Sequence, residues 1–339
     1  MVRIVDLANE LNLSVATVSR ALNNIPAVRP EVAERVREHA ARRGYVANSL
    51  ARSLRSRTRT FVGFLVPDVE NLAYSIAADA CAKYVARSGY QLILAISGDD
   101  PDSELEALRS LAEAQVAGLI IAPTAETRAA SRDLLAGRSV VEFNRVSGIS
   151  GHSVVCDDFA AFRDATGHLL DLGHTSVAYI GTTETVSNGK ERMAGVRDAL
   201  KDAGRRLQRS RVRLLPPTEK DGYDAAMQLL GGPRRPTALL VGSSNLSMGV
   251  ARAVRERGIR VPDEMSLVVY GDSRWGELFE PGLTTIRAPY REMARSVADI
   301  VTGLLADENQ QDRSGAVRLP AELVVRQSTG RPRGATRRD

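Results

Sequence analysis

The chain has 339 residues, of which 43% are apolar and 26% are charged. This composition is ordinary for a globular protein, and the length allows two or three domains. No run approaches the 18 apolar residues of a transmembrane helix and no secretory signal is visible, so we expect a cytoplasmic protein without a membrane partner. Cys81 and Cys156 each lie beside apolar residues, which predicts buried free thiols rather than a disulfide or a metal site.

Positive charge is concentrated at the N-terminus. Residues 1–60 contain eleven arginines and five acidic residues, a net charge of +6, whereas the whole chain carries only +5. Such an asymmetry indicates a polyanionic partner, and nucleic acid fits better than a membrane surface because no strongly apolar helix face accompanies the arginines.

The same segment has the pattern of two short helices joined by a tight break. Apolar residues recur with helical spacing from Ile4 to Leu11, Asn12-Leu13 interrupts the helix, and Ser14 is placed to cap the next one. In that second helix Val18, Ala21 and Leu22 are expected to face the first. The outward set is Val15, Ala16, Thr17, Ser19, Arg20 and Asn23.

This outward face combines small apolar groups, hydroxyls, an amide and a guanidinium, a mixture that suits the major groove of DNA. A third helix is expected over 30–43, ended by Gly44. The three helices predict a helix-turn-helix headpiece whose second helix reads the bases. The alternative is that the two helices merely form part of a small core.

A short segment, 48–56, separates the headpiece from the rest of the chain. Leu50, Ala51 and Leu54 have helical spacing, but nine residues do not hold an isolated helix in water. The pattern leaves two interpretations open, a linker that becomes helical on docking and a flexible tether.

From Phe61 onward, buried strands alternate with helices. The predicted strands are 61–66, 91–95, 119–122, 140–143, 154–156, 177–180, 212–215, 238–241 and 267–270, and the predicted helices between them include 74–87, 103–113, 159–172, 191–203, 223–230 and 246–257. Continuous apolar strands alternating with helices are typical of parallel sheets, and two such series predict an α/β body of two doubly wound subdomains.

Ligands of such sheets bind beyond the carboxyl ends of the strands, so a cleft between the subdomains is the expected site. The polar loops there, together with Trp275, suit a small polar ligand with an apolar face, such as a sugar. Ordinary partial burial is the alternative for Trp275.

Motifs of the common enzyme classes are missing. The chain has no G-x-G-x-x-G, no P-loop, no G-x-S-x-G and no H-E-x-x-H, and its four histidines lack metal-ligand spacing. Asp157 and Asp158 are interpreted as helix caps, and His168 and His174 as solvated or capping residues. We therefore expect no enzyme, no cofactor and no metal.

With these residues in view, the chain closely resembles the LacI/GalR family of bacterial transcriptional regulators over nearly its full length. The resemblance rests on an ordered series of motifs: Thr17-Val18-Ser19-Arg20-Ala21-Leu22-Asn23, Gly44-Tyr45, Ala51-Arg52-Ser53-Leu54, Val66-Pro67-Asp68, Leu172-Gly173-His174, Glu191-Arg192-Met193-Ala194-Gly195, Pro236-Thr237-Ala238 and Pro281-Gly282-Leu283-Thr284-Thr285-Ile286.

The resemblance implies a homodimer bound to a pseudo-palindromic double-stranded operator. Val15, Ala16 and Arg20 would face bases, whereas Thr17, Ser19 and Asn23 would support contacts to the DNA backbone. Ser53, Leu54 and Arg55 would belong to a hinge that folds on DNA, with Leu54 wedged into the minor groove.

The resemblance also implies a small-molecule effector, most simply a sugar or sugar derivative, in the cleft. The residues expected to bind it are Tyr74, Asn144, Arg192, Asn245, Asp272 and Trp275. Ser243-Ser244 and Gly271 depart from the family's usual residues there, so the resemblance names no particular sugar.

The expected organisation is a headpiece at 1–47, a hinge at 48–58, an effector-binding and dimerisation domain at 59–330, and a basic tail at 331–339. Its subdomains would be 59–156 with 287–318, and 157–286 with 319–330. The leading hypothesis is a ligand-responsive repressor. The alternatives are a solute-binding protein of the same bilobed fold and an enzyme that uses the cleft, such as a sugar kinase or isomerase.

Overall fold

The structure is a computed structural model that describes residues 2–22, 27–45, 60–232, 235–272, 274–307 and 315–332. Its contacts divide the chain into two units, Met1–Arg59 and Thr60–Asp339, which we call the headpiece and the body and describe separately. Four predicted DNA-binding residues lie outside the described residues: Asn23, Ser53, Leu54 and Arg55.

The headpiece consists of three short helices around a small core. They are α1 (Ile4–Leu11), α2 (Val15–Leu22) and α3 (Pro30–Arg42), as expected from the sequence. Leu7, Val18 and Val36 contribute one fully buried side chain from each helix. Because so small a core buries little apolar surface, the ends of the helices also have to be secured.

Local hydrogen bonds set the boundaries of the first two helices. Asn12 ends α1 in the left-handed conformation, with φ 55°, which asparagine tolerates better than most residues. The hydroxyl of Ser14 then accepts the backbone N–H of Thr17 at 3.1 Å, which confirms the predicted cap of α2. At the start of α1, the carboxylate of Asp6 accepts the backbone N–H of Arg3 at 2.8 Å.

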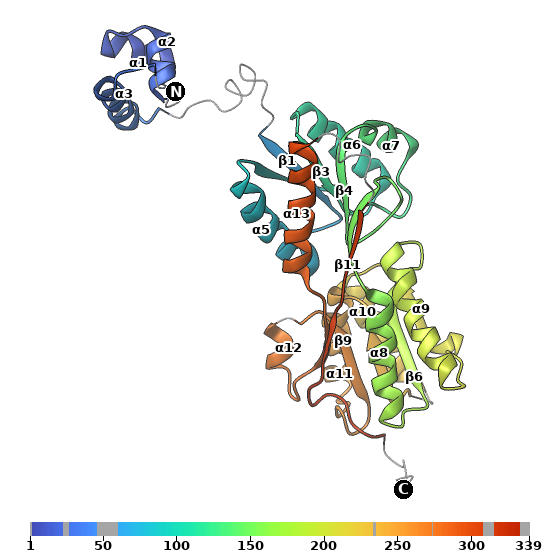
Figure 1. The fold of residues 1–339 in the computed structure, drawn as a ribbon. Helices are drawn as coiled ribbons and strands as arrows, with labels where there is room; N and C mark the ends of the chain where they lie inside the picture. The colour runs from blue at the N-terminus through green and yellow to red at the C-terminus, as the bar shows by residue number, and fades with distance from the viewer. Residues whose placement is uncertain are drawn as a thin grey trace. The chain divides into compact units, whose positions relative to one another are not determined.

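The body contains two six-stranded sheets, each in its own subdomain (Figure 1). Subdomain 1 has the strand order β11-β5-β4-β3-β1-β2, and all pairs are parallel. Its strands are β1 (Phe61–Val66), β2 (Gln91–Ile96), β3 (Gly118–Ile121), β4 (Ser139–Phe143), β5 (His152–Cys156) and β11 (Gly315–Leu319).

Subdomain 2 has the order β12-β10-β9-β8-β6-β7, and it departs from an all-parallel sheet at one edge. Its strands are β6 (Val177–Thr182), β7 (Val212–Leu215), β8 (Ala238–Val241), β9 (Ser266–Tyr270), β10 (Thr284–Arg287) and β12 (Glu322–Val324). The β10–β12 pair is antiparallel, whereas the other pairs of this sheet are parallel, so the predicted α/β body of two doubly wound subdomains is confirmed with one antiparallel edge strand. The reason is topological: β12 enters from the cleft, whereas the other strands of this sheet run toward it.

Helices cover both faces of each sheet. In subdomain 1, α5 (Leu72–Arg87) and α13 (Tyr290–Ala306) pack on one face, and α6 (Pro101–Glu113) and α7 (Ala129–Leu135) pack on the other. In subdomain 2, α8 (Asp158–Asp171) and α9 (Ser187–Asp202) lie opposite α10 (Glu219–Gly231) and α11 (Ser244–Glu256). A short helix, α12 (Arg274–Leu278), follows β9.

The chain crosses between the two subdomains three times. The crossings follow β5, β10 and β11, and the last is visible where β11 continues downward toward subdomain 2 (Figure 1). Since all three strands end at the same side of their sheets, the crossings place the carboxyl ends of both sheets opposite each other. This arrangement forms the cleft. Among the described residues, no helix is long and apolar enough to cross a membrane.

Candidate effector cleft and DNA-binding helix

Three adjoining pockets lie in the cleft of the body. The central pocket is narrow, with about 20 Å³ of open space, and it takes side chains from both subdomains. Its lining is Asn71, Ala73, Tyr74, Asn144, Arg145, Thr182, Asn188, Arg192, Pro217, Ser243, Ser244, Tyr270 and Tyr290. An inner pocket of about 260 Å³ and an outer pocket of about 400 Å³ flank it.

A buried ion pair forms one wall of the central pocket. Arg192 on α9 donates from Nη2 to Oδ2 of Asp158 on α8 at 3.0 Å, and from Nη1 to the carbonyl of Gly242 at 2.8 Å. The guanidinium lies 4.1 Å from the ring centre of Tyr270. Burial opposes the charge of Arg192, but the attractions of Asp158, Tyr270 and Tyr290 together outweigh it and hold the pKa of Arg192 well above its ordinary value. Arg192 is therefore a fixed cation in this wall.

Two residues that follow β4 supply the opposite wall. Asn144, with φ 62°, donates from Nδ2 to the hydroxyl of Tyr74 at 3.3 Å. Arg145, which is buried, donates to both carboxylate oxygens of Asp99, at 2.5 and 3.1 Å. A second buried arginine is therefore already paired with an acid of its own subdomain.

The central pocket gathers buried polar atoms that have no hydrogen-bond partner in the structure. Seven such atoms belong to residues that line it, and these residues come from both subdomains: Asn144 Oδ1, Arg145 Nε, Thr182 Oγ1, Asn188 Oδ1, Arg192 Nε, Ser243 Oγ and Ser244 Oγ. Because an unpaired buried polar group costs about 1–3 kcal/mol, their convergence on one pocket indicates a binding site for a polar ligand.

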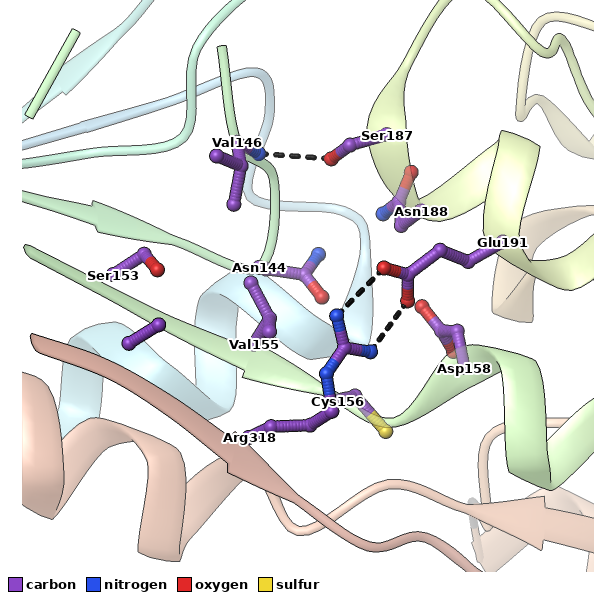
Figure 2. Close-up of a pocket in the computed structure, with 11 residues that line it drawn as sticks. Asn144, Val146, Ser153, Val155, Cys156, Asp158, Ser187, Asn188, Glu191 and Arg318 are labelled. Carbon is purple, nitrogen blue, oxygen red and sulfur yellow. Dashed lines mark hydrogen bonds and ion pairs between the residues drawn. The ribbon is translucent and has the colours of Figure 1, made fainter. Parts of the chain in front are cut away.

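The inner pocket is bordered by contacts that join the two subdomains (Figure 2). Arg318 on β11 donates to both carboxylate oxygens of Glu191 on α9, each at 2.7 Å. The backbone N–H of Val146 donates to Ser187 Oγ at 2.8 Å. We call these two contacts the clasp. They hold α9 against the β4 and β11 side of subdomain 1.

The outer pocket has an acidic lining. Four carboxylates contribute to it, from Asp68, Glu70, Asp99 and Glu219. Asn245, one of the residues predicted to bind effector, lines this pocket rather than the central one.

Of the six predicted effector-binding residues, the structure brings Tyr74, Asn144 and Arg192 together in the central pocket. Asp272 and Trp275 line none of the three pockets. Asp272 instead accepts hydrogen bonds from Thr285 at 3.1 Å and from Arg287 Nε at 2.6 Å, and it forms an ion pair with Arg326. Trp275 packs against the core of subdomain 2. An effector role for these two residues stays a prediction that this arrangement does not support.

The sequence prediction gave several residues of the body a different role from the one that the structure shows. Asp158, interpreted as a cap, is the partner of Arg192, whereas Asp157 is the residue that caps α8. His174, expected to be solvated or capping, is buried, and its Nε2 lies 2.9 Å from the carbonyl of Gly330. Asn188, which lines the central pocket, was not predicted. Polar residues in the first turns of helices could have indicated it, because several of these residues lie at the cleft.

In the headpiece, α2 presents the predicted DNA-reading face. Val18 and Ala21 are buried, whereas Val15, Ala16 and Arg20 are exposed. Thr17 and Ser19 are half-buried beside them. An exposed valine and alanine next to an arginine give this helix an apolar and cationic surface of the kind that fits a major groove.

Known proteins match the chain over almost its whole length. It is 30% identical to catabolite control protein A of Priestia megaterium, over 97% of this chain and 99% of that protein. The chain belongs to the LacI/GalR family of bacterial transcriptional regulators. Another member, the transcriptional regulator GalR of Escherichia coli, is 29% identical over 98% of this chain and 97% of that protein. A model for a periplasmic binding protein-like domain matches residues 166–329.

Solved structures of this family share the fold. The Lac repressor dimer bound to operator and the anti-inducer ONPF superposes with a TM-score of 0.84 at 24% identity, over 97% of this chain and 99% of that one. A LacI family regulator from Mycobacterium smegmatis superposes with a TM-score of 0.72 at 25% identity, over 80% of this chain and 99% of that one. This LacI/GalR member therefore has the α/β fold of a helix-turn-helix headpiece and a periplasmic-binding-protein-like body.

Proposed function

We propose that this LacI/GalR regulator is a repressor that binds a pseudo-palindromic operator as a homodimer and changes its DNA affinity when a small polar effector enters the cleft. The convergence of seven unpartnered buried polar atoms on the central pocket carries the effector half of the proposal. A repressor of this kind acts in the cytoplasm, where its DNA is. We propose the same domain limits as the sequence predicts.

On the DNA side, Val15, Ala16 and Arg20 read bases and Thr17 and Ser19 contact the backbone. Val15 and Ala16 offer only apolar contact, most simply with thymine methyl groups, so Arg20 carries the main polar contact. Asn23 and the hinge residues Ser53, Leu54 and Arg55 have the roles that the family resemblance implies.

On the effector side, Tyr74, Asn144 and Arg192 form the centre of the site together with Asn188 and Arg145. Asn245 lies at the outer pocket. The ligand would fill the central pocket once the subdomains have moved apart, because the central space alone holds little more than a water molecule.

The clasp supplies the coupling between ligand and DNA. A ligand that needs a wider central pocket disfavours the arrangement in which Arg318 pairs with Glu191 and the backbone of Val146 is hydrogen-bonded to Ser187. The two arrangements differ in the relative orientation of the subdomains, so the ligand shifts their populations by its differential affinity. The headpieces of a dimer then change their spacing.

Exposed apolar side chains of the body support a homodimer. Leu94 and Ile96 lie on the edge strand β2, and Leu278 on α12 is 83% exposed. Exposed leucines on a sheet edge and a short helix are an aggregation hazard in a monomer, and pairing with a second copy would cover them.

Selection of DNA fragments on the full-length protein, followed by binding to the selected palindrome at several salt concentrations, tests this proposal. The expected result is sequence-specific binding that weakens steeply with salt and responds to one small molecule. Sequence-independent binding alone would contradict the regulator. Tight ligand binding with no effect on DNA would favour the alternative of a solute-binding protein.

A further inference from the structure

A dense run of positive charge lies in subdomain 2, where the chain enters strand β7. Residues 203–218 contain five arginines and no acidic residue. The run contrasts with the rest of the body, because residues 61–339 together carry a net charge of only −1: the whole chain carries +5 and residues 1–60 carry +6. We call the five arginines the basic patch: Arg205, Arg206, Arg209, Arg211 and Arg213.

Local packing holds the basic patch at the surface. Leu207 and Val212, which lie between its arginines, are partly buried and pack against the core of the body. The backbone N–H of Arg211 donates to the carbonyl of Gln208 at 2.9 Å, in a 3₁₀ turn over Arg209–Arg211. Because the apolar side chains of this segment are used for packing, the long arginine side chains remain available at the surface.

The protein does not neutralise these charges. The first three arginines of the basic patch are exposed and the last two are half-buried, and none of the five forms an ion pair with a residue that the structure describes. Other exposed arginines of the body commonly have an acidic neighbour, as in the pairs Arg128–Asp102, Arg163–Asp198 and Arg197–Glu184. An uncompensated group of cations attracts anions from solution.

The basic patch lies at the end of subdomain 2 that is opposite the cleft, because β7 and its neighbour β6 run toward the cleft and the patch ends as β7 begins. Exposed Arg235 extends the patch. It precedes β8, on the other side of β6, so the starts of β7 and β8 are two strand spacings, or about 10 Å, apart. Exposed Arg331 follows Gly330, whose N–H donates to Ser266 Oγ at the start of β9.

The acidic residues at this end do not cancel the charge. Seven arginines, the basic patch with Arg235 and Arg331, outnumber five acids beside the same strand starts: Asp171, Asp202, Glu256, Asp263 and Glu264. Three of these acids are paired with arginines outside the seven, namely Arg163, Arg252 and Arg260. The surface is therefore a site for a polyanion.

The chemistry of this surface fits the phosphate backbone of double-stranded DNA. A guanidinium offers two parallel N–H groups to a phosphate, and duplex DNA carries one negative charge per about 1.7 Å of its axis. Single-stranded nucleic acid is held by stacking bases on aromatic side chains, and residues 203–218 contain none. A membrane surface would need exposed apolar side chains, whereas Leu207 and Val212 pack inward. The turn Arg209–Arg211 is too short to read a groove, so binding is independent of sequence.

We propose that the basic patch binds the phosphate backbone of a second DNA duplex while the headpieces hold the operator. One protein then connects two stretches of DNA through two surfaces, of which one reads bases and the other contacts only the backbone. This second surface goes beyond the proposed function, on which it depends only for the attachment to the operator.

Surface plasmon resonance on a chip that carries the selected operator tests the proposal. Full-length protein is first bound to saturation, and a duplex of unrelated sequence is then passed over it. We expect this second duplex to be captured, with an affinity that falls steeply as the salt concentration rises. Absence of capture at low salt would overturn the proposal.

A triple variant, Arg205→Gln with Arg206→Gln and Arg209→Gln, removes the exposed charges of the basic patch. Its operator binding should be unchanged because these residues lie in the body. Capture of the second duplex should weaken, and the slope of log affinity against log salt concentration should become shallower by about 3. The matched control changes three exposed arginines of subdomain 1 to glutamine and should leave capture unchanged: Arg109, Arg128 and Arg132.

The possible failures are distinguishable. Equal weakening in the two triple variants would assign the effect to overall charge and overturn the basic patch, and so would tighter capture of single-stranded DNA or of anionic phospholipid vesicles than of the duplex. If no operator holds the protein, the proposed regulator fails, and the basic patch is tested by fluorescence anisotropy of the unrelated duplex in solution. The patch variant should again show the shallower salt dependence there, and an unchanged dependence would overturn the patch.

Discussion

Asp158 and Arg192, in neighbouring helices, form an ion pair that solvent scarcely reaches: their residues are 1% and 4% exposed, and Oδ2 lies 3.0 Å from Nη2. The hydroxyl of Tyr270 donates to the second carboxylate oxygen at 3.2 Å. A buried pair of this kind contributes little net stability over an apolar pair, but loss of one partner leaves an uncompensated charge.

Asp158→Asn should therefore lower the free energy of unfolding of the body by about 3–5 kcal/mol. Urea denaturation followed by circular dichroism measures the change. The control is the adjacent residue: Asp157→Asn keeps a side chain that caps α8 equally well, so its cost should stay below about 1 kcal/mol. Equal losses in the two variants would mean that the Arg192 pair is not the cause.

Arg20→Ala should weaken specific operator binding by about 1–3 kcal/mol, because Arg20 is the polar side chain on the exposed face of α2. Fluorescence anisotropy with the selected operator and with a scrambled duplex separates specific from non-specific binding. Arg109→Ala removes the same charge from an exposed position of the body and should leave both affinities unchanged. A uniform loss on both duplexes would make Arg20 a phosphate contact instead.

The stability of the body should fall as the pH drops below about 6.5, because burial lowers the pKa of His174 from its ordinary value of 6.5. The unfolded chain then binds the proton more tightly than the folded one. This contribution is complete above the unfolded pKa and is lost as the pH falls toward the folded pKa. Urea denaturation at several pH values should give a flatter profile for His174→Gln, and an unchanged profile would refute the assignment.

Two helical glycines in contacting helices should respond to alanine in opposite directions. A Cβ at Gly195 on α9 would lie 2.3 Å from the carbonyl oxygen of Phe159 on α8, so Gly195→Ala should cost about 1–3 kcal/mol. A Cβ at Gly167 on α8 meets nothing within 4 Å, so Gly167→Ala should stabilise by about 0.5–1 kcal/mol. Thermal unfolding of both variants measures whether the first change lowers the stability and the second raises it.

The headpiece and the interior strands of both sheets were predictable from sequence, except β10, whose run Thr284–Arg287 has only one apolar residue. Their signals are strong because helical spacing marks α1 to α3 and continuous apolar runs mark strands buried on both faces. The edge strand β11, Gly315–Leu319, alternates apolar residues with an arginine and is half-exposed, so the rule for buried strands does not select it.

Several helices begin a few residues before their predicted first residue, and this error concealed part of the site. α9 begins at Ser187 rather than at 191, and α8 begins at Asp158 rather than at 159. First turns are polar because their N–H groups need acceptors, so hydrophobic periodicity misses them. In this fold those first turns point at the cleft, and they carry Asn188 and Asp158.

The pairing of arginines with acids was beyond the sequence. Asp99 and Arg145 are 46 positions apart in the sequence, and Arg192 pairs with Asp158 rather than with its neighbour Asp157 because of how α8 and α9 pack. Side-chain partners at such separations depend on the tertiary arrangement, which local patterns do not record.

The three crossings between subdomains have a consequence for how the body can be divided. Each subdomain is assembled from separate stretches of chain, since α13 and β11 return to subdomain 1 only after β6 to β10 have been made. A single proteolytic cut or one gene truncation therefore releases neither subdomain as an intact folding unit. Recombination between relatives would exchange this body as a whole, whereas the headpiece, encoded by one uninterrupted stretch, can be exchanged independently of it.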